Sequence, residues 1–169
     1  LTAKNGTSTI VKEVTVNPAT ISITSATVQD KTYDGTTTAT VESVTFDNLV
    51  NGESLSLGTD YTATAAFNSA NAGSQTATVT VTLTDTVKNY TLASDGNTAT
   101  ATGTISPLPV VLNWETTSFT YDGSAKTVTA KVSNAVDGDT FTLTYEDNRV
   151  PPWAITPPKL PIWATTTTP

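Results

Sequence analysis

Apolar and polar residues alternate along most of this chain, as expected for β-strands with one buried face. The clearest run is residues 76–84, where Val79, Val81 and Leu83 share one face and threonines line the other. Other runs of the same kind occupy residues 20–24, 41–46, 61–67, 89–92, 98–106, 110–114, 128–132 and 141–145. No window has the 3.6-residue period of an amphipathic helix. The pattern therefore predicts an all-β chain.

A short motif occurs twice, as Tyr33-Asp34-Gly35 and as Tyr121-Asp122-Gly123. The two tyrosines lie 88 residues apart, about the length of one small β domain. Asp-Gly supplies a turn in which glycine takes a positive φ. The tyrosine can bury its ring and keep its hydroxyl at the rim. We interpret both copies as structural turns, and direct ligand binding is the alternative.

Two polar-proline boundaries divide the chain, Asn17-Pro18 and Ser106-Pro107. Each ends an alternating run, and proline suits a strand edge or a junction because it cannot donate to a sheet ladder. Residues 1–17 are interpreted as the closing strand or strands of a preceding repeat, or as a donor segment. Residues 18–106 form one complete repeat and residues 107–148 part of a second. Residues 149–169 form a tail rich in Pro, Trp and Thr, whose prolines favour polyproline conformation over sheet pairing.

The composition of the chain narrows the range of functions that it could have. Threonine makes up about a quarter of the chain and suits a pleated surface that is half buried. Cys, Met and His are absent, which removes disulfides, thiolate nucleophiles and the commonest general base. A net charge of −7 argues against nucleic acid and anionic membranes as partners. No apolar run is long enough for a membrane helix, so we expect no membrane insertion. The N-terminal residues do not resemble a signal peptide.

The first copy of the motif is followed by Lys88-Asn89-Tyr90-Thr91-Leu92 and by a Thr-Ala-Thr-rich strand that runs into Ile105-Ser106-Pro107. In this order the motifs resemble the YDG-type repeats of bacterial surface proteins, over nearly all of residues 18–106. The second copy resembles the related MBG-type repeats, as far as residue 148. The resemblance implies tandem small β domains in a large secreted adhesin, with a stalk or spacer role and no catalytic residues. An immunoglobulin-like sandwich is the leading fold and a β-grasp-like unit the runner-up.

Two chemical hypotheses concern side chains near turns. Calcium prefers several oxygen ligands, and Asp137 and Asp139 form the closest acidic pair, although we favour a solvated turn as their explanation. An intramolecular amide cross-link would need a buried, neutral lysine beside an asparagine and an acid. The available residues are Lys31, Lys88 and Asn89. We expect no cofactor other than this calcium alternative.

Trp153 and Trp163 are candidates for contacts with a sugar or a partner groove, with packing of the tail as the alternative. No pair of carboxylates lies in a context that forms a pocket, so we do not expect an enzyme.

The sequence therefore favours a structural stalk or spacer segment of a secreted or cell-surface bacterial adhesin. Its expected partners are neighbouring repeats or identical subunits, together with host or surface glycans or proteins. One alternative is an extracellular filament subunit, in which residues 1–17 of one chain complete the open sheet edge of the next. A second alternative is a carbohydrate-binding module.

Overall fold

The structure is a computed structural model that describes residues 2–6, 8–115, 118–145, 149–150 and 162–167. Compactness divides the chain into two units, which we describe separately. The first contains Leu1–Asp30, Thr38–Asn68 and Ser74–Thr104, and the second contains Lys31–Thr37, Ser69–Gly73 and Ile105–Pro169. The division is not contiguous, because the loop of residues 31–37 belongs to the first repeat in sequence and to the second unit in the structure.

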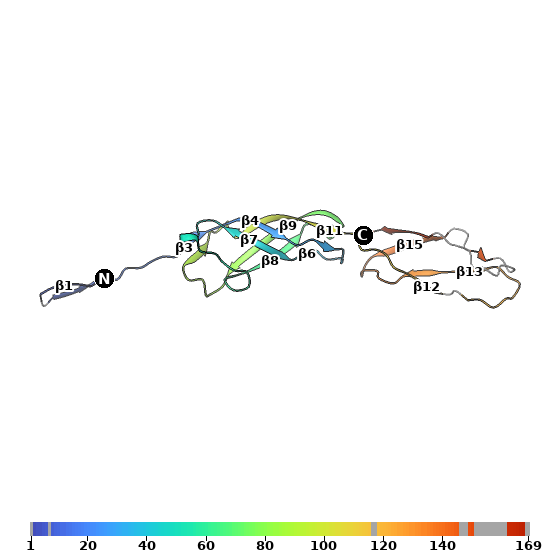
Figure 1. The fold of residues 1–169 in the computed structure, drawn as a ribbon, viewed down its shortest axis with the longest axis horizontal. Helices are drawn as coiled ribbons and strands as arrows, with labels where there is room; N and C mark the ends of the chain where they lie inside the picture. The colour runs from blue at the N-terminus through green and yellow to red at the C-terminus, as the bar shows by residue number, and fades with distance from the viewer. Residues whose placement is uncertain (1, 7, 116–117, 146–148, 151–161, 168–169) are drawn as a thin grey trace. The chain divides into compact units, whose positions relative to one another are not determined.

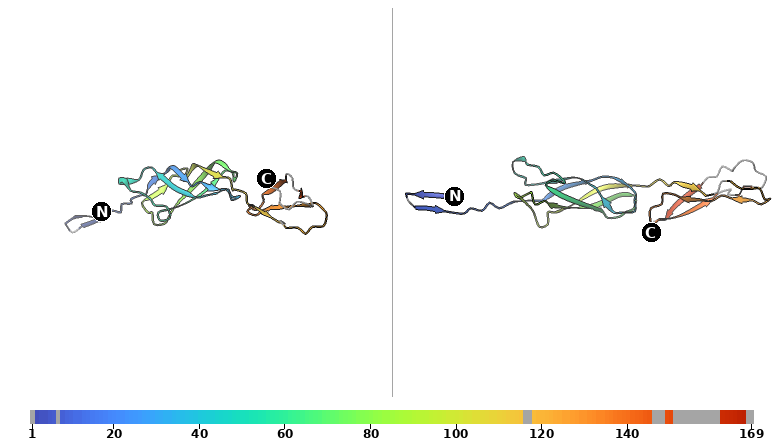
Figure 2. Two further views of the ribbon diagram at one scale, coloured as in Figure 1. Left: turned by 45° about the vertical axis from the view of Figure 1, so that its right-hand side comes forward. Right: turned by 90° about the horizontal axis from the view of Figure 1, so that it is seen from below.

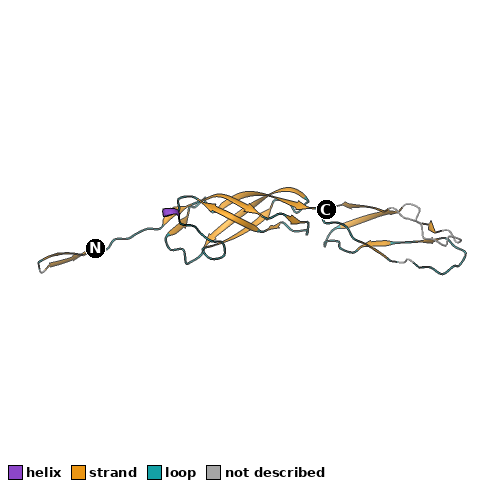
Figure 3. Cartoon of the chain, viewed as in Figure 1, coloured by secondary structure: helices purple, strands orange, loops and turns teal. Residues whose placement is uncertain are grey.

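The first unit is built around the long strand β9 (Gly73–Leu83), which lies between β8 (Tyr61–Phe67) and β11 (Thr98–Ser106), with β6 (Thr38–Ala39) beyond β8. A second, antiparallel pair, β4 (Ile23–Val28) and β7 (Val41–Phe46), crosses the face of this sheet (Figure 1). At one end β3 (Ala19–Ile21) pairs in parallel with β10 (Tyr90–Leu92). A single 3-10 turn, Val50–Gly52, follows β7 (Figure 3).

The core of the first unit follows from the alternation in the sequence. In β9, Ala77, Val79 and Val81 are 0–2% exposed while Thr78 and Thr82 face solvent. The ring of Phe46 in β7 meets that of Tyr61 in β8 edge-on at 5.1 Å between centroids. Gly103 of β11 lies against Phe67 and Val28, so the crossing pair and the larger sheet share one apolar interior. The other buried apolar residues of this unit are Ile21, Ala39, Val41, Tyr90 and Ala101.

One predicted strand is broken. Residues 20–24 were expected to form a single strand, but β3 ends at Ile21 and β4 begins at Ile23. At the break, the backbone N–H and hydroxyl of Ser22 both donate to the Asp47 carboxylate, at 2.8 and 2.9 Å. The Ser22 carbonyl accepts from the Asp47 N–H. Asp47 thus replaces the ladder partners of Ser22 and lets the two halves join different sheets.

Residues 2–11 form their own hairpin, β1 (Thr2–Asn5) with β2 (Ser8–Val11), around a turn at Gly6 with a φ of 61°. The alternating pattern continues to residue 16, but the strand ends at Val11 and Val14 and Val16 are 62% and 90% exposed. The alternating pattern therefore extends beyond the strand that forms.

Among its described residues, the second unit contains three two-stranded antiparallel sheets; their strands are coloured yellow to red in Figure 2. β12 (Leu112–Trp114) pairs with β14 (Ala130–Val132), β13 (Lys126–Thr127) with β16 (Arg149–Val150), and β15 (Thr140–Tyr145) with β17 (Ile162–Thr167). In addition, β5 (Lys31–Thr32) runs parallel to the last two residues of β11. The Tyr145 hydroxyl holds Ala130 by accepting from its N–H at 3.0 Å and donating to its carbonyl at 3.2 Å.

The tail takes part in this second unit. From the sequence, residues 149–169 stood apart and the second repeat lacked its closing strands, yet β16 and β17 come from the tail and pair with β13 and β15. The segment Ile162–Thr167 contains no proline and is rich in β-branched residues, so it can complete a ladder. The tail's prolines lie outside the described residues.

The expectation of an all-β chain is confirmed. No α-helix occurs in the described ranges, which favours packed sheets over a β-grasp arrangement with its helix. No helix among the residues described is long and apolar enough to cross a membrane.

Candidate functional site

The Tyr-Asp-Gly loop of the second unit is held by hydrogen bonds among its own polar residues. Gly35 has a φ of 76°, a conformation that costs a side-chain-bearing residue about 1 kcal/mol or more. The Asp34 carboxylate accepts from the backbone N–H and the hydroxyl of Thr36, both at 2.9 Å. Lys31 donates to the same carboxylate at 2.7 Å and to the Thr36 carbonyl at 2.9 Å. The loop is thus closed by its own side chains.

These contacts favour the ionised form of Asp34. The hydrogen bond from Lys31, followed by that from the Thr36 N–H, lowers the pKa of the Asp34 carboxyl from 3.8 to about 2. Because the Asp34 side chain is 52% exposed, solvent screens this ion pair, and its role is to shape the turn.

The second copy of the motif forms the same turn with a rearranged lysine. Gly123 has a φ of 78°, and Asp122 accepts from the Ser124 N–H at 2.9 Å. Here Lys126, which follows the motif, pairs with Asp122 and, with the Ser124 N–H, lowers the pKa of its carboxyl. The turn chemistry is therefore repeated, while the position of the cation is not.

The two tyrosines have different surroundings. Tyr33 is half-buried, donates its N–H to the Ser106 carbonyl at 2.8 Å, and donates its hydroxyl to the Asp139 carboxylate at 2.8 Å. The bond to Asp139 raises the pKa of the Tyr33 hydroxyl. Tyr121 is 76% exposed, so the idea that the motif buries its ring fails at this copy. Burial depends on a partner from elsewhere in the chain, which the motif itself does not supply.

The acids near turns act mainly as acceptors of hydrogen bonds. Asp139 receives the Tyr33 hydroxyl, whereas Asp137 is exposed. Asp30 and Asp60 accept backbone N–H groups of Thr104 and Ser56 at 2.7 and 2.8 Å. Within the described ranges no three acidic side chains gather as a metal site would require. The calcium hypothesis therefore has no supporting cluster in this part of the chain.

The candidate cross-link residues belong to different units. Lys31 lies in the second unit and is bound to Asp34 and Thr36. Lys88 and Asn89 are neighbours in the first unit, and both are exposed. Amide formation needs a lysine desolvated enough to lose its proton, and the exposed Lys88 does not meet that condition.

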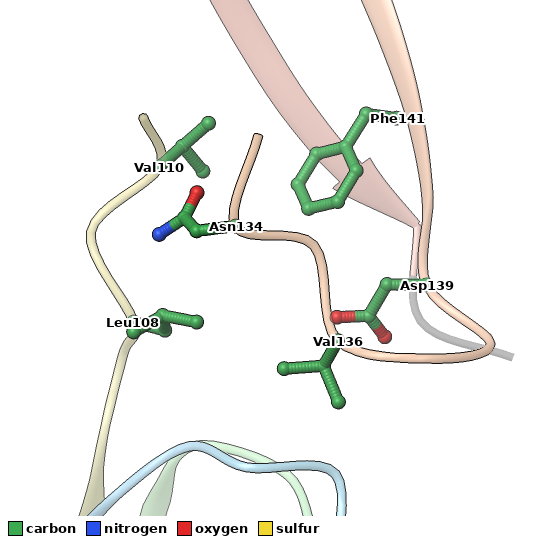
Figure 4. Close-up of a pocket in the computed structure, with 6 residues that line it drawn as sticks. All are labelled: Leu108, Val110, Asn134, Val136, Asp139 and Phe141. Atoms are coloured by element: carbon green, nitrogen blue, oxygen red, sulfur yellow. The ribbon is translucent and has the colours of Figure 1, made fainter. Parts of the chain in front are cut away.

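The tryptophan candidates are only partly described. Trp153 lies outside the described residues. Trp163 is in β17, where its backbone stands opposite Thr144. A small, partly open pocket in this unit measures about 40 Å³ (Figure 4), room for little more than water. It is lined by Leu108, Val110, Asn134, Val136, Asp139 and Phe141.

Sheets without a helical layer, joined by turns that close on their own side chains, define a class of small β-repeat proteins. The family model of the YDG domain matches residues 17–101, just over half of the chain. The chain therefore belongs to the YDG domain family. No curated protein and no solved structure matches it. The likeness of residues 107–148 to MBG-type repeats stays a prediction.

Proposed function

We propose that this chain is a structural segment, a stalk or spacer, of a secreted or cell-surface bacterial adhesin. The observation that carries the proposal is the alternation of buried apolar and exposed polar side chains along the strands. Ala77, Val79 and Val81 of β9 are buried, whereas Thr78 and Thr82 on its other face are exposed. Membership of the YDG family supports the proposal, because such domains occur in surface proteins of this kind.

The proposed role is mechanical and involves no reaction. Strand pairing and a small apolar core would hold each repeat folded outside the cell, and neighbouring repeats would be its main partners. An acidic surface with a net charge of −7 keeps such a segment apart from nucleic acid and from anionic lipid. The absence of Cys and Met leaves little for oxidants to modify.

Location is the part of this proposal that can be tested first. An antibody raised against the full chain should label intact cells of the producing bacterium without permeabilisation, and external protease should remove that label. A cytoplasmic protein of the same cells serves as the control for leakage. Labelling that appears only after lysis would contradict the proposal.

A further inference from the structure

The turn that receives Tyr33 occurs twice in the chain. Residues 134–143 read Asn-Ala-Val-Asp-Gly-Asp-Thr-Phe-Thr-Leu, and residues 48–57 read Asn-Leu-Val-Asn-Gly-Glu-Ser-Leu-Ser-Leu. The two segments share one backbone hydrogen bond and the conformation of their glycine, although Asn51 has a positive φ of 54° and Asp137 does not. The N–H of the acid donates to the valine carbonyl three residues earlier, at 3.0 Å in both, and both glycines have a positive φ. Val136-Asp137-Gly138-Asp139 and Val50-Asn51-Gly52-Glu53 therefore correspond in sequence and in this hydrogen bond, and both are here called acid turns.

Each acid turn holds a tyrosine hydroxyl. In the first unit, Tyr90 of β10 donates its hydroxyl to Glu53 and accepts from the Val50 N–H at 2.9 Å. In the second unit, the hydroxyl on Asp139 is that of Tyr33. Tyr90 belongs to the same repeat as its turn, whereas Tyr33 comes from the repeat before.

A second contact in the second unit reinforces the first. A Cβ added at Gly35 would lie 2.6 Å from Cγ1 of Val136, so the glycine of the motif lets its loop approach the valine of the acid turn. The tyrosine and the glycine of one motif thus contact the acid and the valine of one turn. At the second copy, nothing lies within 4 Å of a Cβ added at Gly123.

We propose that the Tyr-Asp-Gly loop is a clasp that a repeat extends to the acid turn of the repeat following it. Residues 31–37 would then complete the second unit, which obtains from the preceding repeat the tyrosine that Tyr90 supplies in the first. This inference rests on the proposed function, in which the chain is a series of structural repeats. It identifies the acid turn of the next repeat as the partner of the Tyr-Asp-Gly motif. Folding of the second unit depends on the clasp.

A double-mutant cycle in the full chain tests the pairing. All three tryptophans lie beyond residue 106, so tryptophan fluorescence during urea unfolding follows the second unit. Tyr33→Phe and Asp139→Ala should each raise its unfolding equilibrium constant about fivefold to tenfold, the usual effect of losing such a bond. The double variant should be no worse than the worse single variant. Tyr121→Phe and Asp137→Ala, which change an exposed tyrosine and an exposed acid, are the matched controls and should leave the constant unchanged.

A glycine pair tests the close approach independently. Gly35→Ala and Gly123→Ala place alanine at nearly the same φ, so their backbone costs should match. Gly35→Ala should raise the unfolding constant several-fold more than Gly123→Ala does, because only the alanine at position 35 brings its Cβ against Val136. Additive effects in the cycle, or equal effects of the two alanines, would overturn the clasp. Either result would leave the surface-labelling test of the proposed function untouched, since that test depends on location alone.

Discussion

Aspartate side chains at the turns of this protein mostly hold backbone N–H groups. Asp34 and Asp122 do so within the two copies of the motif, and Asp47 does so where β3 gives way to β4. A carboxylate that accepts two or three such bonds is stabilised in its ionised form. The acidic composition of the chain therefore has a structural use, although nothing in the sequence pattern distinguishes these acids from calcium ligands.

Asp34 provides the sharpest residue-scale prediction. Hydrogen bonds from Lys31 and from the Thr36 N–H lower the pKa of its carboxyl from the ordinary 3.8 to about 2. A depressed carboxyl pKa contributes stability that is present above the unfolded value and is lost as the pH falls through the folded value. NMR titration of the Asp34 carboxyl should thus show a midpoint near 2, and Lys31→Gln should move it upward. A midpoint near 4 in the unaltered chain would contradict the geometry of the loop.

Strands in the first unit follow the sequence closely, and their exceptions have identifiable causes. β7 and β8 begin and end as the alternation predicts, at residues 41–46 and 61–67. The break at Ser22 was not predictable, because it depends on Asp47, which is 25 residues away. The pairing of β17 with β15 was not predicted either. β17 follows a proline-rich stretch, and the prolines obscure its strand pattern.

The motif itself was only partly predictable. The turn follows from Asp-Gly chemistry and occurs at both copies. The partner of Tyr33, 106 residues further along the chain, cannot be found from local pattern. The repetition of the acid turn at residues 48–57 and 134–143 was the available signal, and it becomes informative only once one turn is seen to hold a tyrosine.

A reciprocal swap on β9 tests the two faces of a strand. Val79→Thr puts a hydroxyl at a position that is 0% exposed and should cost about 1–3 kcal/mol of unfolding free energy. Thr78→Val, one residue away on the exposed face, should stay within about 0.5 kcal/mol. Urea unfolding followed by far-UV circular dichroism measures both. Equal costs would mean that the alternation does not decide which face is buried.

The filament alternative makes a different prediction about the whole molecule. It depends on a second repeat without closing strands, whereas β15 has a partner, β17, from its own chain. Residues 2–5 and 8–11 likewise pair with each other. We therefore expect sedimentation velocity to show one monomeric species across a hundredfold range of concentration. Growth into chains that is lost on removal of residues 1–17 would favour the filament instead.

At the scale of the whole repeat, we expect two parallel strand pairings to resist tension. β3 runs parallel to β10, and β5 runs parallel to the end of β11. When the two ends of the first repeat are pulled apart, strands paired in parallel slide along each other, so their hydrogen bonds must break together. A repeat built in this way should resist extension until it yields as a whole.

Pulling on single molecules of the full chain by its ends tests this mechanical account most directly. The account predicts a discrete force peak for the first repeat, residues 18–106, followed by release of roughly 300 Å of chain at about 3.3–3.6 Å per residue. Val79→Thr should lower that peak, and Thr78→Val should not. Smooth extension with no peak, at forces where a disordered chain would extend, would contradict the account.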